Sequence, residues 1–223
     1  MSKELLIRAV TRFFAGVLLV GLLLFLPAWT LNYPQAWLLM GVLFIPMFMA
    51  GLVMMAKNPE LLRKRLSVNE GEREQRQVIA ASGIMFIAAF VAAALSFRFG
   101  FLMLPWPVSI AGAVLFLAAY GLFAEVLREN TYLSRTVEVQ ENQKVIDTGL
   151  YGLVRHPMYM ATVVLFLSMP LVLGSVVSLV IMLAYFPIIT RRILNEEQVL
   201  REGLPGYEEY MKKVKYRLIP FIW

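Results

Sequence analysis

The chain contains no cysteine and a single histidine, and only 16% of its 223 residues are charged. The absence of cysteine excludes disulfide bonds, thiolate nucleophiles and cysteine-ligated metal sites. With His156 as the one imidazole, a histidine-built metal centre is not expected, and we predict no bound metal. The scarcity of charge argues against a soluble globular domain, in which about a quarter of the residues are charged.

Hydrophobic residues take the place of the missing charges. They make up 60% of the chain, and the mean hydropathy is +0.70. The 21 basic and 15 acidic residues give a net charge of +6. Because the basic residues lie beside hydrophobic runs, they favour contact with anionic lipid headgroups over nucleic acid. We therefore expect an all-α integral membrane protein with the lipid bilayer as a partner and no nucleic-acid partner.

Four hydrophobic runs are long enough to cross a bilayer as helices. They lie at about residues 13–31, 36–56, 78–97 and 106–127, and a hydrocarbon core about 30 Å thick requires about 20 apolar residues. The first run is long and no small-residue cleavage site follows it, so we interpret it as a membrane helix rather than a signal peptide. Residues 1–128 are thus predicted to form four full transmembrane helices.

The last hydrophobic stretch, residues 157–190, is too long for one ordinary span, because a continuous helix would be about 50 Å long. Pro170 and Gly174 interrupt it. If the stretch is split at residues 169–175, it becomes a hairpin of two short helices of about 12 and 16 residues, short for a full crossing. Local signals do not decide between these arrangements, because proline alone only kinks a helix.

The distribution of positive charge favours the hairpin. With the N-terminus in the cytoplasm and a hairpin at the end, only Arg98 of the 21 basic residues falls in an outside loop. A single helix would instead export the basic residues of the C-terminal tail, against the positive-inside rule. We therefore predict a short C-terminal helical hairpin and two cytoplasmic termini, and we expect a bacterial inner-membrane protein.

Two clusters of polar residues flank this predicted hairpin. The first contains Arg155 and His156, followed by Pro157 at the expected start of a helix. Proline suits the first turn of a helix, and the free backbone N–H groups there can bind an anion such as a carboxylate. The second cluster contains Glu196 and Glu197, about 40 residues later, and can attract a cationic or hydroxyl-rich ligand. The hairpin brings the two clusters to the same side of the membrane.

Each cluster also has a simpler interpretation. Arg155 and His156 can extend to the interface from a helix end, as basic side chains do at membrane surfaces. Arg192 and Glu196 have the i,i+4 spacing of a surface ion pair, which contributes about 0.2–0.5 kcal/mol. A ligand that carries both a carboxylate and a positive charge would satisfy the two clusters together.

The chain resembles the isoprenylcysteine carboxyl methyltransferase family in two segments. The first contains Val139-Gln140, Lys144-Val145-Ile146, Gly149, Tyr151, Arg155-His156-Pro157 and Tyr159, and the second contains Arg192, Glu196-Glu197, Leu200, Gly206, Tyr207, Tyr210, Val214 and Leu218-Ile219-Pro220. The strong similarity covers about residues 130–220. Phospholipid methyltransferases and membrane sterol reductases carry elements similar to Arg-His-Pro-x-Tyr. One departure is Ala161, where many members of the family have glycine.

This resemblance implies that the protein uses S-adenosylmethionine as a methyl donor. Residues 129–223 would then form a cytoplasmic cofactor-binding connector, the hairpin and the tail. The residues implied to bind the cofactor are Gln140, Lys144, Val145, Ile146, Tyr151, Arg155, His156, Pro157, Met158, Tyr159, Glu196 and Glu197. Arg192 would contact the carboxylate of the substrate, and His156 is the only imidazole that can serve as a base. We therefore treat Arg192 and His156 as candidate catalytic residues.

The implied reaction is methylation of a membrane-associated acceptor. We expect carboxyl O-methylation of an isoprenylcysteine-like or other lipid-linked carboxylate. A phospholipid N-methyltransferase, which takes an ethanolamine headgroup, would share the cofactor. A membrane protein without methyltransferase activity, such as a sterol-reductase-like enzyme, is a further alternative, although no glycine-rich dinucleotide fingerprint is visible. The sequence does not indicate an oligomeric state.

Overall fold

The computed structural model describes residues 3–66, 73–130, 132 and 139–223. In these residues the regular structure is helical, apart from one isolated bridge between Met103 and Ser175. The helices are α1 (Lys3–Ala28), α2 (Pro34–Lys57), α3 (Pro59–Leu66), α4 (Arg73–Phe99), α5 (Trp106–Glu129), the 3-10 turn η1 (Gly149–Gly152), α6 (Pro157–Leu173), α7 (Val176–Met182), α8 (Tyr185–Gly203) and α9 (Tyr207–Lys213). The predicted all-α fold is confirmed.

Five stretches of the structure are long and apolar enough to cross a membrane. Four are within α1, α2, α4 and α5, and they correspond to the four predicted spans. The fifth runs through α7 and α8, from Val176 to Gly203, while α6 is a shorter apolar helix. Large apolar side chains such as Leu18, Ile84 and Val114 are exposed along these helices. Such exposed apolar faces are what a bilayer covers, so the chain is an integral membrane protein.

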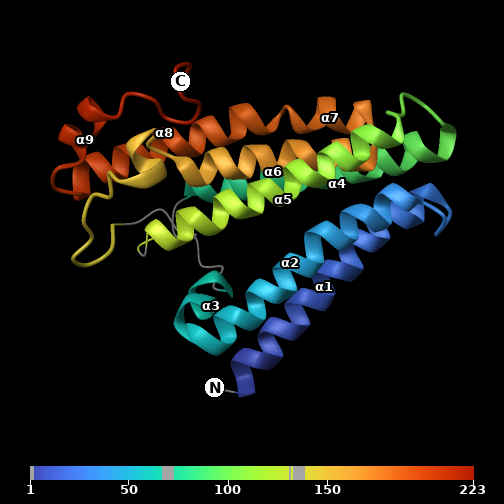
Figure 1. Ribbon diagram of the computed structural model, residues 1–223, viewed down its shortest axis with the longest axis horizontal. Coiled ribbons are helices and arrows are strands. Elements are labelled where there is room, and N and C mark those ends of the chain that lie inside the picture. Colours follow the sequence, from blue (N-terminus) through green and yellow to red (C-terminus); the bar gives the residue numbers. More distant parts are fainter. Residues whose placement is uncertain (1–2, 67–72, 131, 133–138) are drawn as a thin grey trace.

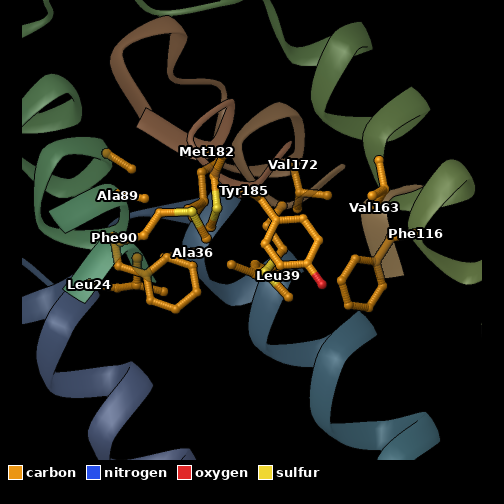
Figure 2. Close-up of a cluster of buried hydrophobic side chains, with 14 of the residues drawn as sticks. Leu24, Ala36, Leu39, Ala89, Phe90, Phe116, Val163, Val172, Met182 and Tyr185 are labelled. Carbon is orange, nitrogen blue, oxygen red and sulfur yellow. The ribbon is translucent and has the colours of Figure 1, made fainter. Parts of the chain in front are cut away.

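The long helices form two groups (Figure 1). Helices α1 and α2 run side by side as an antiparallel pair, and α3 lies at one end of this pair. Helices α4 to α8 form a second bundle, in which the α5–α6 contact is the most extensive, and α1 and α2 pack against α4 and α6 respectively. Buried apolar side chains from both groups meet, among them Leu24, Ala36, Phe90 and Val172 (Figure 2).

The predicted C-terminal hairpin is present, and its turn at Gly174 and Ser175 lies within the predicted range 169–175, although the first arm has 17 residues rather than about 12. Pro170 lies inside α6, and the helix ends at Gly174, which has φ 68° and the left-handed conformation. Glycine adopts this conformation without a steric penalty, which makes it a common helix terminator. The Ser175 hydroxyl then accepts a hydrogen bond from the Ser178 N–H at 3.2 Å and caps α7.

The returning arm of the hairpin is longer than the predicted 16 residues. After α7 the helix breaks at residues 183–184 and continues as α8 to Gly203. The polar second half of α8, which contains Arg192 and Glu196, extends the apolar first half without a further break. The predicted hairpin ended at residue 190 because it followed hydropathy, whereas helical hydrogen bonding continues through polar residues.

The C-terminal tail folds back onto the start of α6. Beyond α9, the carbonyl oxygens of Tyr216 and Arg217 accept hydrogen bonds from the backbone N–H groups of Arg155 and His156, both at 2.9 Å. The connector that precedes α6 lies at this same end of the bundle (Figure 1). Three segments that are distant in sequence therefore meet where α6 begins and α8 ends.

Candidate functional site

A cavity lies at this meeting point of the connector, α6, α8 and the tail. The empty space between its walls, including the part that is open to solvent, is about 860 Å³. Ten of the predicted site residues line it: Lys144, Val145, Ile146, Tyr151, Arg155, His156, Met158, Tyr159, Arg192 and Glu196. Arg155 and His156 of the first polar cluster and Glu196 of the second therefore line one space.

The side chains of Tyr159, Arg192 and Glu196 form a network on the wall of the cavity. The Tyr159 hydroxyl donates a hydrogen bond to the Glu196 carboxylate and accepts one from the Arg192 Nε at 2.8 Å. The Arg192 guanidinium also lies 5.8 Å from the centre of the Tyr159 ring. The His156 ring stacks on the Tyr159 ring, with 5.6 Å between the two ring centres. An imidazole, a carboxylate, a guanidinium and a phenol ring therefore lie together at the cavity.

Glu197 is the centre of a buried ionic cluster behind the cavity. Its Oε1 accepts a hydrogen bond from the Arg155 Nε at 2.7 Å, and its Oε2 accepts one from the Arg217 Nε at 2.9 Å. The His156 Nε2 lies 3.4 Å from the Oε1. Arg155 and Glu197 are only 6% and 4% exposed. Because each charge has an opposite charge in contact, this cluster avoids the large cost of an unpaired buried ion.

The same cluster fastens the tail. The Arg155 Nη1 donates hydrogen bonds to the carbonyl oxygens of Val214 and Lys215, at 2.8 and 2.9 Å. Arg217, which contacts Glu197, belongs to the tail as well. Glu197 therefore connects α8 to the start of α6 and to the tail, and it holds in position the residues that line the cavity.

Tyr151 anchors the connector from two directions. Its hydroxyl accepts a hydrogen bond from the Asn130 amide at the end of α5, at 2.9 Å. Its carbonyl oxygen accepts one from the Tyr210 hydroxyl in α9, at 2.8 Å. The turn η1 that contains Tyr151 is thus held between a membrane helix and the tail.

The Tyr207 hydroxyl lacks a hydrogen-bond partner in the part of the chain that the structure describes. The residue lines the cavity and is only 4% exposed. Burial raises the pKa of Tyr207 far above its ordinary value, and the carboxylates of Glu197 and Glu196 raise it further. The phenol is therefore protonated at neutral pH, and a buried hydroxyl without a partner is costly unless a ligand or water accepts its proton.

Three predicted ligands are not among the residues that line the cavity: Gln140, Pro157 and Glu197. The Gln140 amide instead donates to the carbonyl oxygen of Tyr132, at 2.6 Å. Pro157 occupies the first turn of α6, as predicted, and Glu197 has the buried position described above. Cofactor contact by these three residues stays a prediction.

Eight further residues line the cavity that sequence reasoning did not assign to the site: Asn130, Tyr132, Gln143, Val199, Leu200, Leu204, Tyr207 and Tyr210. Leu200, Tyr207 and Tyr210 belong to the tail pattern on which the family resemblance rests, and this was the available signal. The others are in no local pattern that marks a site. They reach the cavity through the tertiary arrangement of the connector, α8 and the tail.

Comparisons with known proteins agree with this architecture. Residues 107–205 match the family model described as phospholipid methyltransferase. The chain is 28% identical to the Delta(14)-sterol reductase TM7SF2 of Mus musculus over 91 residues, which are 40% of this chain and 22% of the reductase. It thus spans only about a fifth of the length of that curated relative.

A solved structure has a similar fold over most of the chain. The eukaryotic intramembrane Ras methyltransferase ICMT (isoprenylcysteine carboxyl methyltransferase) superposes with a TM-score of 0.58 and 19% sequence identity. The similarity covers 92% of this chain and 74% of that one. At this level of identity, the likeness establishes the fold.

The fold and the matched segment together define the class of the protein. It is an integral membrane protein with the helical architecture of the intramembrane methyltransferases. All ten predicted residues that line the cavity lie within the segment that matches the phospholipid methyltransferase family. The resemblance to membrane methyltransferases that the sequence indicates is thereby confirmed.

Proposed function

We propose that the protein is an S-adenosylmethionine-dependent methyltransferase that acts on a membrane-associated acceptor. The observation that carries this proposal is the composition of the cavity at the end of the membrane-helix bundle. Side chains of both charge signs, several aromatic rings and the Tyr207 hydroxyl, which has no partner among the described residues, line one space. This combination suits a compact ligand that has both positive and negative groups.

The residues of the cavity fit the chemistry of this cofactor. Glu196 is a carboxylate acceptor for an amino group or for ribose hydroxyls, and Lys144 is a cation for a carboxylate. The rings of Tyr151 and Tyr159 offer faces to a sulfonium ion, which aromatic rings attract as they do other cations. The Tyr207 hydroxyl would gain the acceptor that it lacks among the described residues. Which contact each residue makes is part of the proposal.

When bound, S-adenosylmethionine supplies a methyl group on a positively charged sulfur. Transfer to a carboxylate removes both charges, so bulk water would stabilise the separated reactants more than the transition state. The apolar side chains of Val145, Ile146, Met158 and Leu200 would exclude water from this part of the cavity. The surrounding network would orient the two reactants, and water exclusion and orientation would supply most of the acceleration.

For the acceptor, we propose an isoprenylcysteine-like or other lipid-linked carboxylate. Arg192 lines the cavity, and its guanidinium can pair with a carboxylate through two parallel hydrogen bonds. A carboxylate is ionised at pH 7 and needs no general base. The hydrophobic part of such an acceptor would remain among the apolar helices, while its charged end reaches the cavity.

The second candidate is N-methylation of a phospholipid ethanolamine headgroup. The description of the family model that matches residues 107–205 favours it. An amine nucleophile must lose a proton, and His156 lines the cavity as the available imidazole. A sterol-reductase-like activity is not favoured, because the similarity covers only 22% of that relative.

Calorimetric titration of the detergent-purified protein with S-adenosylmethionine and with its demethylated product tests the cofactor. We expect micromolar binding that Glu196→Gln weakens at least tenfold, the equivalent of about 1.4 kcal/mol. Glu202→Gln is the matched control, because Glu202 is exposed on the same helix and does not line the cavity. If the folded protein binds neither compound in detergent or in lipid, the proposal is wrong.

The acceptor is tested by incubation of membranes that contain the protein with a radiolabelled methyl donor. Carboxyl methylation gives methyl esters that base hydrolyses to volatile labelled methanol. N-methylation gives labelled phospholipids that withstand the same treatment. Label in the first fraction supports the carboxylate acceptor, and label in the second supports the ethanolamine headgroup.

A further inference from the structure

A second cavity lies on a different face of α8, where this helix packs against the first turns of α4. We call it the α4–α8 groove, and the empty space between its walls, including the part that is open to solvent, is about 1260 Å³. Its residues on α8 include Arg191 and Asn195, whereas the cavity of the candidate site takes the next residues, Arg192 and Glu196. Because consecutive residues of a helix point about 100° apart, the two spaces are lined by different stripes of α8.

The polar residues that line the α4–α8 groove are Gln77, Arg191, Asn195 and Gln198, and no carboxylate is among its lining residues. Each of the four side chains can donate hydrogen bonds. Arg191 is exposed and forms no ion pair within the described residues. The Asn195 Nδ2 is buried and has no acceptor among them. The groove therefore presents several hydrogen-bond donors, one of which is a cation, and this lining can bind an anion.

The remaining lining residues are apolar, and all except Leu194, which lies beside Asn195, are on the side of the membrane. Gln77 is the first residue of the membrane-length stretch of α4, and Ala81 lies one turn further into it. On α8, Ile188 lies one turn before Arg191, on the side of the apolar half of the helix. The polar end of the groove thus lies at the boundary of the apolar region, and its apolar end continues along the helices.

We propose that the α4–α8 groove binds an anionic phospholipid of the surrounding bilayer. The phosphate group would contact Arg191 and the Asn195 amide, and the first carbons of an acyl chain would lie against Ala81 and Ile188. Free phosphate would use only the polar end, whereas a lipid accounts for the whole length of the groove. This inference is independent of methyl transfer, because it involves none of the residues of the candidate site.

Native mass spectrometry of the protein in a mild detergent tests the proposal. Equal amounts of phosphatidylglycerol and phosphatidylcholine are offered, and bound lipids are counted. We expect preferential retention of phosphatidylglycerol, and Arg191→Gln should reduce it about fivefold, the factor that corresponds to about 1 kcal/mol per basic residue at an anionic surface. Arg201→Gln is the control, because Arg201 is an exposed basic residue of α8 outside the groove.

A second variant, Ala81→Trp, fills the apolar end and leaves the cation in place. It should lower phosphatidylglycerol retention as much as Arg191→Gln, with an unchanged melting temperature as evidence of folding. Inorganic phosphate in excess should not displace the lipid. Equal retention of the two lipids, equal loss in Arg191→Gln and Arg201→Gln, or displacement of the lipid by phosphate would each overturn the proposal.

Discussion

Glu196 and Glu197 are neighbours in sequence but have different surroundings. Glu197 is buried against Arg155, His156 and Arg217, while Glu196 accepts a hydrogen bond from Tyr159 at the wall of the cavity. On a helix, adjacent side chains point in directions about 100° apart. The two carboxylates therefore have separable effects, one on the integrity of the site and the other on the ligand.

We expect Glu197→Gln to lower the stability of the protein by about 3 kcal/mol. The substitution leaves the buried Arg155 without its counter-charge, and removal of one partner of a buried ion pair typically costs about 3–5 kcal/mol. Thermal unfolding in detergent, followed by circular dichroism, measures the change. Glu196→Gln, whose residue is partly exposed, should lose less than about 1 kcal/mol. Equal losses in the two variants would contradict the distinction.

Tyr207→Phe should weaken ligand binding without lowering stability, the reverse of the effect expected of Glu197→Gln. The hydroxyl has no partner in the described residues, so its removal should leave the melting temperature unchanged or slightly raised. If the proposed cofactor accepts a hydrogen bond from this phenol, its affinity should fall about three- to tenfold. Calorimetric titration of the variant measures this. An unchanged affinity would mean that Tyr207 does not contact the ligand.

At the scale of elements, the close packing of α5 on α6 supports the site. A Cβ atom at Gly112 of α5 would lie 2.8 Å from both the Leu171 Cβ and the backbone nitrogen of Val172 in α6. Only glycine permits this approach, since the obstructing atoms include backbone. The position of α6, and with it the cavity at its start, therefore depends on this contact.

Gly112→Ala should destabilise the protein by about 1–3 kcal/mol, the usual cost of overpacking. Gly121→Ala on the same helix is the matched control, because a Cβ there meets nothing within 4 Å. The control should be neutral or more stable by up to about 1 kcal/mol, since alanine is the better helix former. The melting temperatures of the two variants in detergent give the comparison. A neutral Gly112→Ala would show that α6 can shift away.

Hydropathy alone located the four long spans, because α1, α2, α4 and α5 each contain an apolar run of membrane length. The hairpin required a second argument, the distribution of positive charge. Its turn at Gly174 lies within the predicted range 169–175, whereas the continuation of α8 to Gly203 was not predicted. Proline inside a membrane helix is tolerated, so α6 continues past Pro170 and is longer than the predicted 12 residues.

The candidate site was predictable where its residues form a local pattern. Four residues of the 155–159 segment and Glu196 are in or next to such patterns and line the cavity: Arg155, His156, Met158, Tyr159 and Glu196. Asn130 and Leu204 could not be predicted, because only the tertiary contacts of the connector and the tail bring them there. The buried position of Glu197 also depends on Arg217, which approaches it only because the tail folds back.

At the scale of the whole molecule, the two ends of the bundle differ in character. At the end away from the cavity, the Arg98 guanidinium lies 5.7 Å from the ring of Trp29 and 5.4 Å from that of Phe99. Aromatic and basic side chains of this kind gather at membrane interfaces. The basic tail and the candidate site occupy the other end, which we predict from the positive-inside rule to face the cytoplasm.

The absence of cysteine makes this orientation directly measurable. Phe99→Cys and Glu202→Cys each introduce one thiol, at exposed positions near opposite ends of the bundle. In intact cells, a membrane-impermeant maleimide should label Phe99→Cys, and it should label Glu202→Cys only after the membrane is made permeable. The reverse pattern would contradict the predicted topology.

The shared hydroxyl of Tyr159 has a kinetic consequence. It joins Glu196, the proposed partner of the methyl donor, to Arg192, the proposed partner of the acceptor. A ligand that binds Glu196 or Arg192 competes with Tyr159 for that residue. Loss of one of the two hydrogen bonds of the Tyr159 hydroxyl then changes the strength of the other. The two substrates would therefore influence each other's affinity within a ternary complex. The steady-state rate law would be sequential rather than ping-pong.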